Sequence, residues 1–266
     1  MATSHRLGHR LGHRLASSAV LLCTLVCAAC SWVPSEPLEV VSISARSQPA
    51  QRLVIVLPGL GEDMSDLQRS GIAAAIQRGM PEADVTLALA SVRYYLDGGM
   101  PKRVHDQVVV PARQRYGEIW LAGASMGGGG VTMYEREYPG EMAGLVLLAP
   151  WMGPESLLEE IQQAGGVGRW NPGPVPAEVK GFDIAREQWR MIQTWTREPA
   201  RARNVWLVCG THDSLLPASE LLAQVLPRDH YFKNDGIHDW TAWTAAATTI
   251  FTRIAAGTSA MEVPPG

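Results

Sequence analysis

The chain has 266 residues, of which 23 are basic and 26 acidic, and its formal net charge is −3 at pH 7. This balance excludes a nucleic-acid-binding protein, because no basic stripe is present to contact a phosphate backbone. Three of the four cysteines fall within the first thirty residues, so internal disulfides cannot hold the rest of the chain together. Stability must therefore come from a hydrophobic core, and the roughly 236 residues after position 30 are enough for one α/β domain.

The first thirty residues have the features of an export signal. A basic start with three arginines is followed by an apolar stretch at 16–29, which is too short to span a bilayer as a mature helix. Two alanines then precede Cys30, an order that resembles a bacterial lipoprotein signal. This resemblance implies that residues 1–30 are a signal peptide, that Cys30 is lipidated, and that the mature chain contacts a membrane through this lipid.

One position departs from the lipoprotein pattern, because Cys27 stands where a leucine is usual. Cleavage at an Ala-x-Ala-like site and an uncleaved anchor are therefore the alternatives. Ser31 after the cysteine resembles the pattern for outer-membrane sorting in Gram-negative bacteria. The expected location is the bacterial cell envelope, lipid-anchored to the outer membrane and facing the periplasm, with residues 31–37 as a proline-containing tether.

The rest of the chain alternates between strand-like and helix-like segments, and the expected folded domain covers 38–256. Near-continuous apolar runs of the kind buried on both faces of a parallel sheet occur at 52–57, 84–89, 118–123, 143–149 and 204–210. Segments with helical spacing lie between them, including one at 104–115. The alternation predicts an α/β fold with a mostly parallel sheet, helices on both faces, and functional groups at the carboxyl ends of the strands.

The alternation breaks at about 151–203. Two helix-like pieces flank a stretch at 165–181 that is rich in glycine and proline. We predict a helical cap over a pocket at the carboxyl edge of the sheet, with a helix pair on the flank as the alternative. Residues 257–266 are expected to be a flexible polar tail.

The most informative motif is Gly-Ala-Ser-Met-Gly at 123–127, which follows an apolar run. A strand that enters a helix through one tight turn lifts the central side chain clear of the sheet, and small residues are needed two positions away on either side. Four consecutive glycines, Gly127 to Gly130, would each cost a helix about 1 kcal/mol relative to alanine. Their presence indicates close packing, and Ser125 is the predicted nucleophile. The alternative is a glycine-rich turn with an ordinary serine.

A serine hydroxyl needs a histidine to accept its proton. Four histidines lie outside the signal: His105, His212, His230 and His238. His105 precedes the serine in a predicted helix, and His230 starts the predicted last strand. His238 follows that strand in a glycine-containing loop, where the base must arrive, so we predict His238, against a loop histidine that caps a helix.

That histidine needs a carboxylate. The apolar run at 205–209 turns at Gly210 and presents Asp213 at its end, which predicts Asp213 as the acid. Asp235 and Asp239 are rivals because they neighbour His238 in sequence. Neighbouring residues rarely point at the same ring nitrogen, however, and His212 is then a bystander.

The transition state of acyl transfer also needs backbone donors for its oxyanion. The loop Leu-Pro-Gly-Leu-Gly at 57–61 follows the first buried strand, so the amides of Leu60 and Met126 are the predicted pair. An ordinary strand-to-helix turn is the alternative for this loop.

Four motifs, at 57–61, 123–127, 210–213 and 236–240, make the chain resemble the α/β-hydrolase superfamily over nearly all of its mature length. The chain order Ser, Asp, His is that of the superfamily. The resemblance implies the α/β-hydrolase fold, a Ser125, Asp213, His238 triad, no metal and no organic cofactor. Many members have histidine before the oxyanion glycine where this chain has Pro58, which loosens the assignment of Leu60.

The function expected from these motifs is hydrolysis of small-molecule carboxylic esters by a serine hydrolase through an acyl-enzyme. Lipase, thioesterase and acyltransferase activities on the same triad stay open. The alternative of another class is a non-catalytic hydrolase-like lipoprotein that binds a ligand or an envelope partner. A complete triad favours the enzyme.

Overall fold

A computed structural model describes residues 37–179, 181 and 183–261, with side chains described up to residue 257. By its contacts the chain divides into Met1–Pro37 and Leu38–Gly266. The predicted signal, Cys30 and most of the tether lie outside the described residues. Among the described helices, none is both long and apolar enough to cross a membrane.

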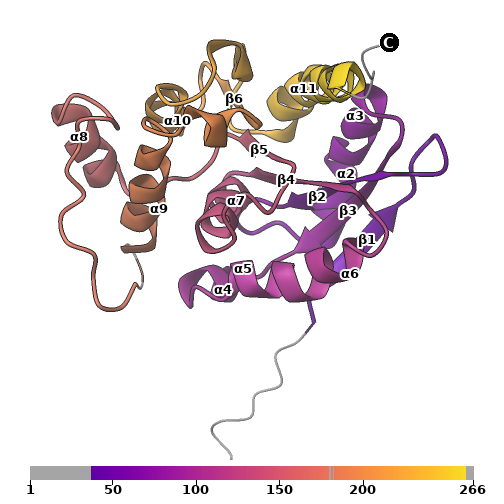
Figure 1. Cartoon of the computed structure of the whole chain (residues 1–266), viewed down its shortest axis with the longest axis horizontal. Helices are drawn as coiled ribbons and strands as arrows, with labels where there is room; N and C mark the ends of the chain where they lie inside the picture. Colours follow the sequence, from indigo (N-terminus) through magenta and orange to yellow (C-terminus); the bar gives the residue numbers. More distant parts are fainter. Residues whose placement is uncertain (1–36, 180, 182, 262–266) are drawn as a thin grey trace, which may run out of the picture. The chain divides into compact units, whose positions relative to one another are not determined.

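A seven-stranded sheet with the order β1-β3-β2-β4-β5-β6-β7 organises the second unit (Figure 1). β1 runs antiparallel to β3, and all other neighbours are parallel. The five apolar runs form strands within one residue of the predicted bounds. The strands are β1 (Glu39–Ile43), β2 (Arg52–Leu57), β3 (Ala83–Leu89), β4 (Glu118–Ala124), β5 (Gly144–Leu148), β6 (Val205–Gly210) and β7 (Tyr231–Asn234).

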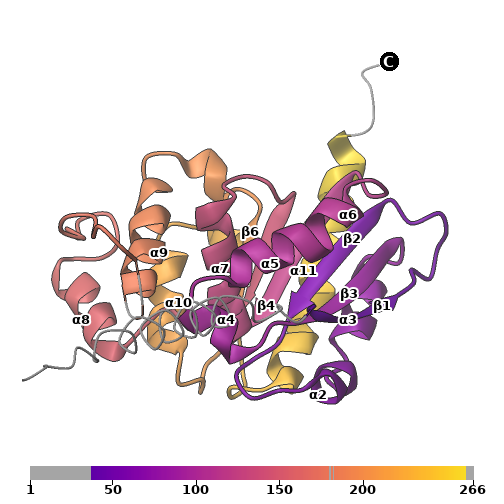
Figure 2. The ribbon, with the colours of Figure 1, turned by 90° about the horizontal axis from the view of Figure 1, so that it is seen from below.

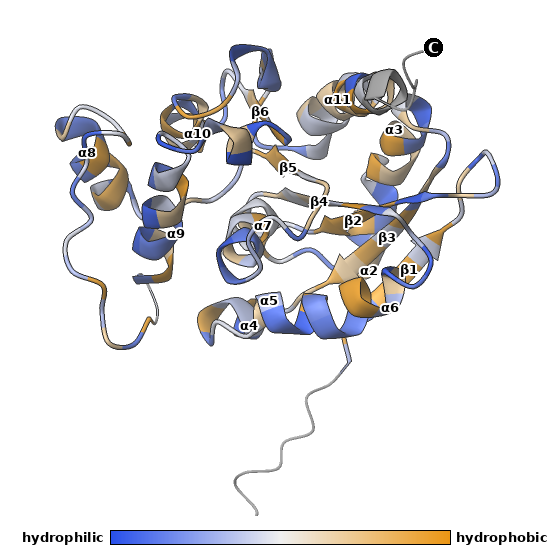
Figure 3. Cartoon of the chain, in the orientation of Figure 1, coloured by the Kyte–Doolittle hydropathy of each residue, from blue (hydrophilic) through white to orange (hydrophobic). Residues whose placement is uncertain are grey.

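Helices cover both faces of this sheet (Figures 1 and 2). Along β2, Leu53 and Ile55 point into one core cluster while Val54 and Val56 point into the other. Both faces are therefore buried, which explains the continuous apolar runs. Figure 3 shows the result, with hydrophobic strands between helices that carry hydrophilic residues.

The first of these clusters packs against α4 (Val92–Leu96), α5 (Met100–Val104), α7 (Met126–Glu137), α8 (Glu155–Gln163), α9 (Asp183–Thr194) and α10 (Leu216–Ala223). The second packs against α2 (Met64–Arg69), α3 (Ile72–Gly79) and α11 (Trp240–Met261). Short helical turns complete the chain at α6 (Val110–Ala112), η1 (His105–Val109), η2 (Pro199–Ala202) and η3 (Arg228–His230).

Two helical segments differ from the sequence expectation. The segment predicted as one helix at 104–115 is a π-helical turn, η1, between the end of α5 and the short α6. α11 continues to Met261, past the point where the flexible tail was predicted to begin. Gly257 lowers helix propensity, but a single glycine does not end a helix whose neighbours, among them Ala255 and Ala256, favour it.

The segment predicted as a cap contains α8 and α9 and lies between β5 and β6. α9 packs on α7, where Gln188 Nε2 donates to the carbonyl of Gly129 at 2.6 Å. The two helices of the insertion are joined by Arg186, whose guanidinium donates to both oxygens of Glu160 and lowers the pKa of that carboxyl to about 2. The insertion is thus fixed both internally and against α7.

The crossing of α3 over α11 depends on Gly79. A Cβ at this position would lie 2.7 Å from the backbone nitrogen of Thr252 in α11. We expect Gly79→Ala to lower the free energy of unfolding by about 2 kcal/mol, because rigid backbone must shift to admit the methyl group. Gly117→Ala is the matched control, since nothing lies within 4 Å of the added methyl group. Urea titration measures both, and equal stability of the two variants would contradict this account.

Candidate active site

Ser125 lies at the turn where β4 ends and α7 begins. Its backbone has φ 53 and ψ −116, a conformation that L-residues rarely adopt outside strained functional turns. Hydrogen bonds from both sides hold this conformation, because Ser125 N–H donates to Leu148 O at 2.9 Å and Trp151 N–H donates to Ser125 O at 2.8 Å. The adjoining strand and loop therefore fix the direction of the hydroxyl.

The glycines that follow are explained by what their missing Cβ atoms would contact. A Cβ at Gly127 would lie 2.5 Å from the carbonyl oxygens of Leu57 and Pro58, so this glycine lets the 57–61 loop approach Ser125. An added Cβ atom at each of the next three positions would also come too close to a neighbour. These neighbours are Pro150 for Gly128, Trp151 for Gly129 and Tyr95 for Gly130. Close packing around the start of α7 therefore outweighs the low helix propensity of glycine.

His238 and Asp213 form a hydrogen-bonded pair. Asp213 follows β6 with its side chain fully buried, and His238 follows β7 with 31% of its side chain exposed. The distances from His238 Nδ1 to Asp213 Oδ1 and Oδ2 are 2.8 and 2.9 Å. A carboxylate can only accept, so Nδ1 carries the proton and Nε2 of the neutral ring is left as an acceptor. No hydrogen bond joins the described side chains of Ser125 and His238.

The rival residues make other contacts. Asp239 Oδ1 accepts from Ala242 N–H at 2.9 Å at the start of α11, and the exposed Asp235 lies 3.3 Å from His212. His105 stacks on Tyr138, and His230 stacks on Trp206 with a centroid separation of 3.7 Å. Of the three candidate carboxylates, Asp213 is therefore the one that is hydrogen-bonded to His238 in the described structure.

The 57–61 loop lies beside Ser125, and its backbone N–H groups differ in their partners among the described residues. Gly59 N–H is occupied, because it donates to Glu62 Oε2 at 2.6 Å. No described residue accepts a hydrogen bond from the N–H of Leu60 or from that of Met126, the first residue of α7. The amino terminus of a helix also carries a partial positive charge, so this corner can stabilise an anion.

Glu62 and Trp240 are site residues that sequence reasoning missed. The indole N–H of Trp240 donates to Glu62 Oε1, so one carboxylate bridges the 57–61 loop and the start of α11. Trp240 meets Trp243 edge to face at 5.2 Å, and Trp243 meets His238 in the same way at 4.8 Å. The bridge thus continues to the histidine ring. The only sequence signal was an acid just after the loop and two tryptophans just after the histidine.

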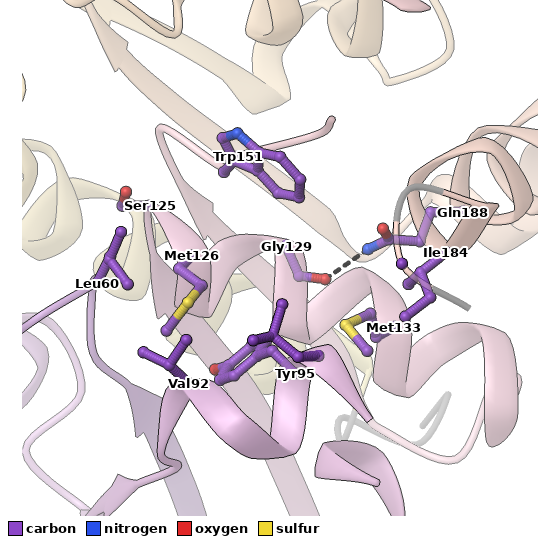
Figure 4. Close-up of a pocket in the computed structure, with 12 residues that line it drawn as sticks. Leu60, Val92, Tyr95, Ser125, Met126, Gly129, Met133, Trp151, Ile184 and Gln188 are labelled. Atoms are coloured by element: carbon purple, nitrogen blue, oxygen red, sulfur yellow. Dashed lines mark hydrogen bonds between the residues drawn. The ribbon is translucent and has the colours of Figure 1, made fainter. Parts of the chain in front are cut away.

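A cavity of about 460 Å³ opens beside Ser125 (Figure 4). Its described walls come from the 57–61 loop, α4, α7, the loop after β5 and α9. The lining residues are Leu60, Val92, Tyr95, Leu96, Ser125, Met126, Gly129, Met133, Trp151, Gly181, Ile184 and Gln188. The predicted cap therefore supplies one wall, and the α4 wall was not predicted. Within the described part of the chain, no group of three or more metal-ligating side chains is placed to hold a metal ion.

No protein-family model and no curated protein sequence matches the chain, but many solved structures share its fold. Est1E from Butyrivibrio proteoclasticus is 16% identical with a TM-score of 0.58, and the match covers 84% of this chain and 95% of that one. S-formylglutathione hydrolase from Staphylococcus aureus is 17% identical with a TM-score of 0.53, covering 84% and 99%. An arylesterase is 14% identical with a TM-score of 0.53, covering 91% and 94%. The chain therefore has the α/β-hydrolase fold.

Proposed function

We propose that the chain is a serine hydrolase that cleaves carboxylic esters through an acyl-enzyme formed on Ser125. The observation that carries this proposal is the pair of His238 and buried Asp213, together with the strained turn that exposes Ser125. The solved structures of similar fold include esterases, which supports the same reaction class. Water is the proposed acyl acceptor.

In the proposed reaction, Ser125 Oγ attacks the ester carbonyl and its proton passes to His238 Nε2. Asp213 stabilises the resulting imidazolium, and the N–H groups of Leu60 and Met126 donate to the oxyanion. His238 then protonates the leaving alkoxide, and the acyl group stays on Ser125. Water, deprotonated by His238, attacks the acyl carbon and releases the acid, which restores the serine hydroxyl. No metal or organic cofactor is needed for these steps.

A fluorophosphonate probe tests the proposal, because it reacts with an activated serine and not with an ordinary one. We expect covalent labelling that mass spectrometry places on Ser125 and that parallels loss of turnover of p-nitrophenyl acetate. Absence of labelling, with the protein folded, would favour the non-catalytic ligand-binding alternative.

We further propose Glu62 as a positioning residue for the oxyanion loop. In the native protein the two oxygens of Glu62 accept separately from Gly59 N–H and from the indole N–H of Trp240. Glu62→Gln has only one side-chain oxygen, so it cannot hold both donors in this way. We expect kcat to fall about 10- to 100-fold with little change in KM, because misplacement of the loop affects the transition state most. Asp63→Asn is the control, since it removes a neighbouring charge from an exposed helix-capping residue. Steady-state kinetics compare the two variants, after thermal unfolding has shown that both are as stable as the native protein. An unchanged kcat in Glu62→Gln would refute this role.

The anchor also remains a proposal, which rests on the sequence of residues 1–30. Cys30→Ala should release the protein from the membrane fraction and leave ester turnover intact, because the folded unit begins at Leu38. Fractionation of cells that produce each form measures this. A variant that stays membrane-bound after mild washing would exclude lipidation at Cys30.

A further inference from the structure

The cavity beside Ser125 has a composition that restricts what it can bind. None of the described residues that line it is charged, and most are aliphatic, aromatic or methionine. Among these described residues Gln188 is the only one with a side-chain amide, and its Nε2 already donates to Gly129 O and to Thr132 Oγ1, both at 2.6 Å. A charged group would lose its hydration there, and no described lining residue carries an opposite charge to compensate, whereas an apolar group gains from burial.

The position of the cavity relative to the reacting atoms indicates which part of an ester enters it. In the tetrahedral intermediate, the oxyanion faces Leu60 and Met126, and the leaving oxygen must face His238 to receive its proton. Neither His238 nor Asp213 is among the described residues that line the cavity. The fourth substituent of the carbonyl carbon, the acyl chain, is therefore the one directed into it.

The leaving-group side has the opposite character. His238 has 31% of its side chain exposed, and its neighbour Ile237 is 58% exposed. An alcohol on this side stays in contact with water, so its chain length should matter little.

The length of the acyl chain follows from the wall that α7 provides. Met126, Gly129 and Met133 lie on one face of α7 and line the cavity from the Ser125 end inward (Figure 4). Seven residues of helix rise about 10 Å. Carbon–carbon bonds of about 1.5 Å advance an extended chain about 1.25 Å each, so about eight to ten carbons fill this length.

Resting on the proposed function, we propose that this cavity is an acyl-binding site for uncharged, medium-chain acyl groups of about eight to ten carbons, and that the alcohol portion is held in solvent. Leu96, which is 69% exposed, and Trp151, which is 38% exposed, make the entrance apolar. Each methylene added to the acyl chain should raise kcat/KM about three- to fourfold until the cavity is full. Beyond about ten carbons the rise should stop.

The test compares two isomers, methyl nonanoate and octyl acetate, which carry the same eight-carbon alkyl chain on opposite sides of the ester. We expect kcat/KM for methyl nonanoate to be at least about tenfold higher, because only its chain is buried. Ile184→Trp, which narrows the cavity from α9, should lower this ratio at least about tenfold. Val110→Trp, at an exposed position outside the cavity, is the matched control. If Ile184→Trp does not fold, Val92→Trp narrows the opposite wall.

A ratio of one or less in the native protein would overturn the acyl assignment and leave the hydrolase proposal standing. Binding of methyl nonanoate to the Ser125→Ala protein, measured by calorimetry, gives a readout that does not need turnover. If no ester is cleaved, the hydrolase proposal fails, and this binding then decides whether the cavity is a medium-chain acyl site. Absence of binding would overturn the site in that case too.

Discussion

Replacing Ser125 with alanine should lower kcat for p-nitrophenyl esters by about 10⁴-fold or more, and His238→Ala should do the same. In the proposed mechanism, the alanine at 125 removes the nucleophile, whereas the alanine at 238 removes the group that accepts its proton. Since the two residues act in one step, the double variant should lose little more than either single one. Steady-state kinetics with active-site titration measure all three.

The control for this pair is stability. Neither side chain lies deep in the core, so the thermal midpoint of each variant should stay within a few degrees of the native value. His212→Ala, at a histidine whose side chain is 70% exposed and lies beside Asp235, should retain most activity. Full activity of Ser125→Ala would refute the mechanism, and losses that add fully in the double variant would show that the two residues do not act in one step.

Asp213→Asn should lower kcat by about 10³- to 10⁴-fold. The fully buried carboxylate accepts from His238 Nδ1 and also from Leu215 N–H at 2.8 Å. An asparagine keeps one oxygen for Leu215 but removes the charge that, in the proposed mechanism, fixes the histidine tautomer and stabilises the imidazolium. The loss should therefore appear in kcat, with little loss of fold stability.

Asp235→Asn and Asp239→Asn are the matched controls, since both remove one negative charge within three residues of His238. Asp235 is exposed, and an asparagine at 239 can still accept from Ala242 N–H at the start of α11. Both variants should retain most activity. If either loses activity while Asp213→Asn keeps it, Asp213 is not the acid of the triad.

The strands β2 to β6 could be predicted because they are buried on both faces. A run such as Leu53 to Leu57 is apolar at every position, whereas a helix with one buried face shows apolar residues only at every third or fourth position. β1 escaped prediction because it is an edge strand whose residues are mostly exposed or half-buried. The segment that forms α4 and α5 is short and broken by two glycines, Gly98 and Gly99, so its periodicity is too brief to recognise.

Only part of the candidate site could be predicted from the sequence. Ser125, Asp213 and His238 each stand in or just after a turn that follows a strand, so local patterns place them without knowledge of the tertiary structure. The bridge from Glu62 to Trp240 joins residues 178 positions apart, and the cavity combines α4 with α9. Such contacts are decided by how the elements pack, and single-sequence patterns carry no record of this.

The start of α7, where four glycines are closely packed, tolerates substitution much less than the cavity wall does. No side chain can be added at Gly127, Gly128, Gly129 or Gly130 without meeting a neighbouring segment, so the part of the chain that holds the proposed nucleophile cannot vary. The cavity wall supplied by α4 lies on a segment outside the central sheet, and its side chains Val92 and Leu96 are exposed. Selection for a new substrate can therefore change this wall while the proposed chemistry stays constant. Libraries aimed at altered selectivity belong in α4.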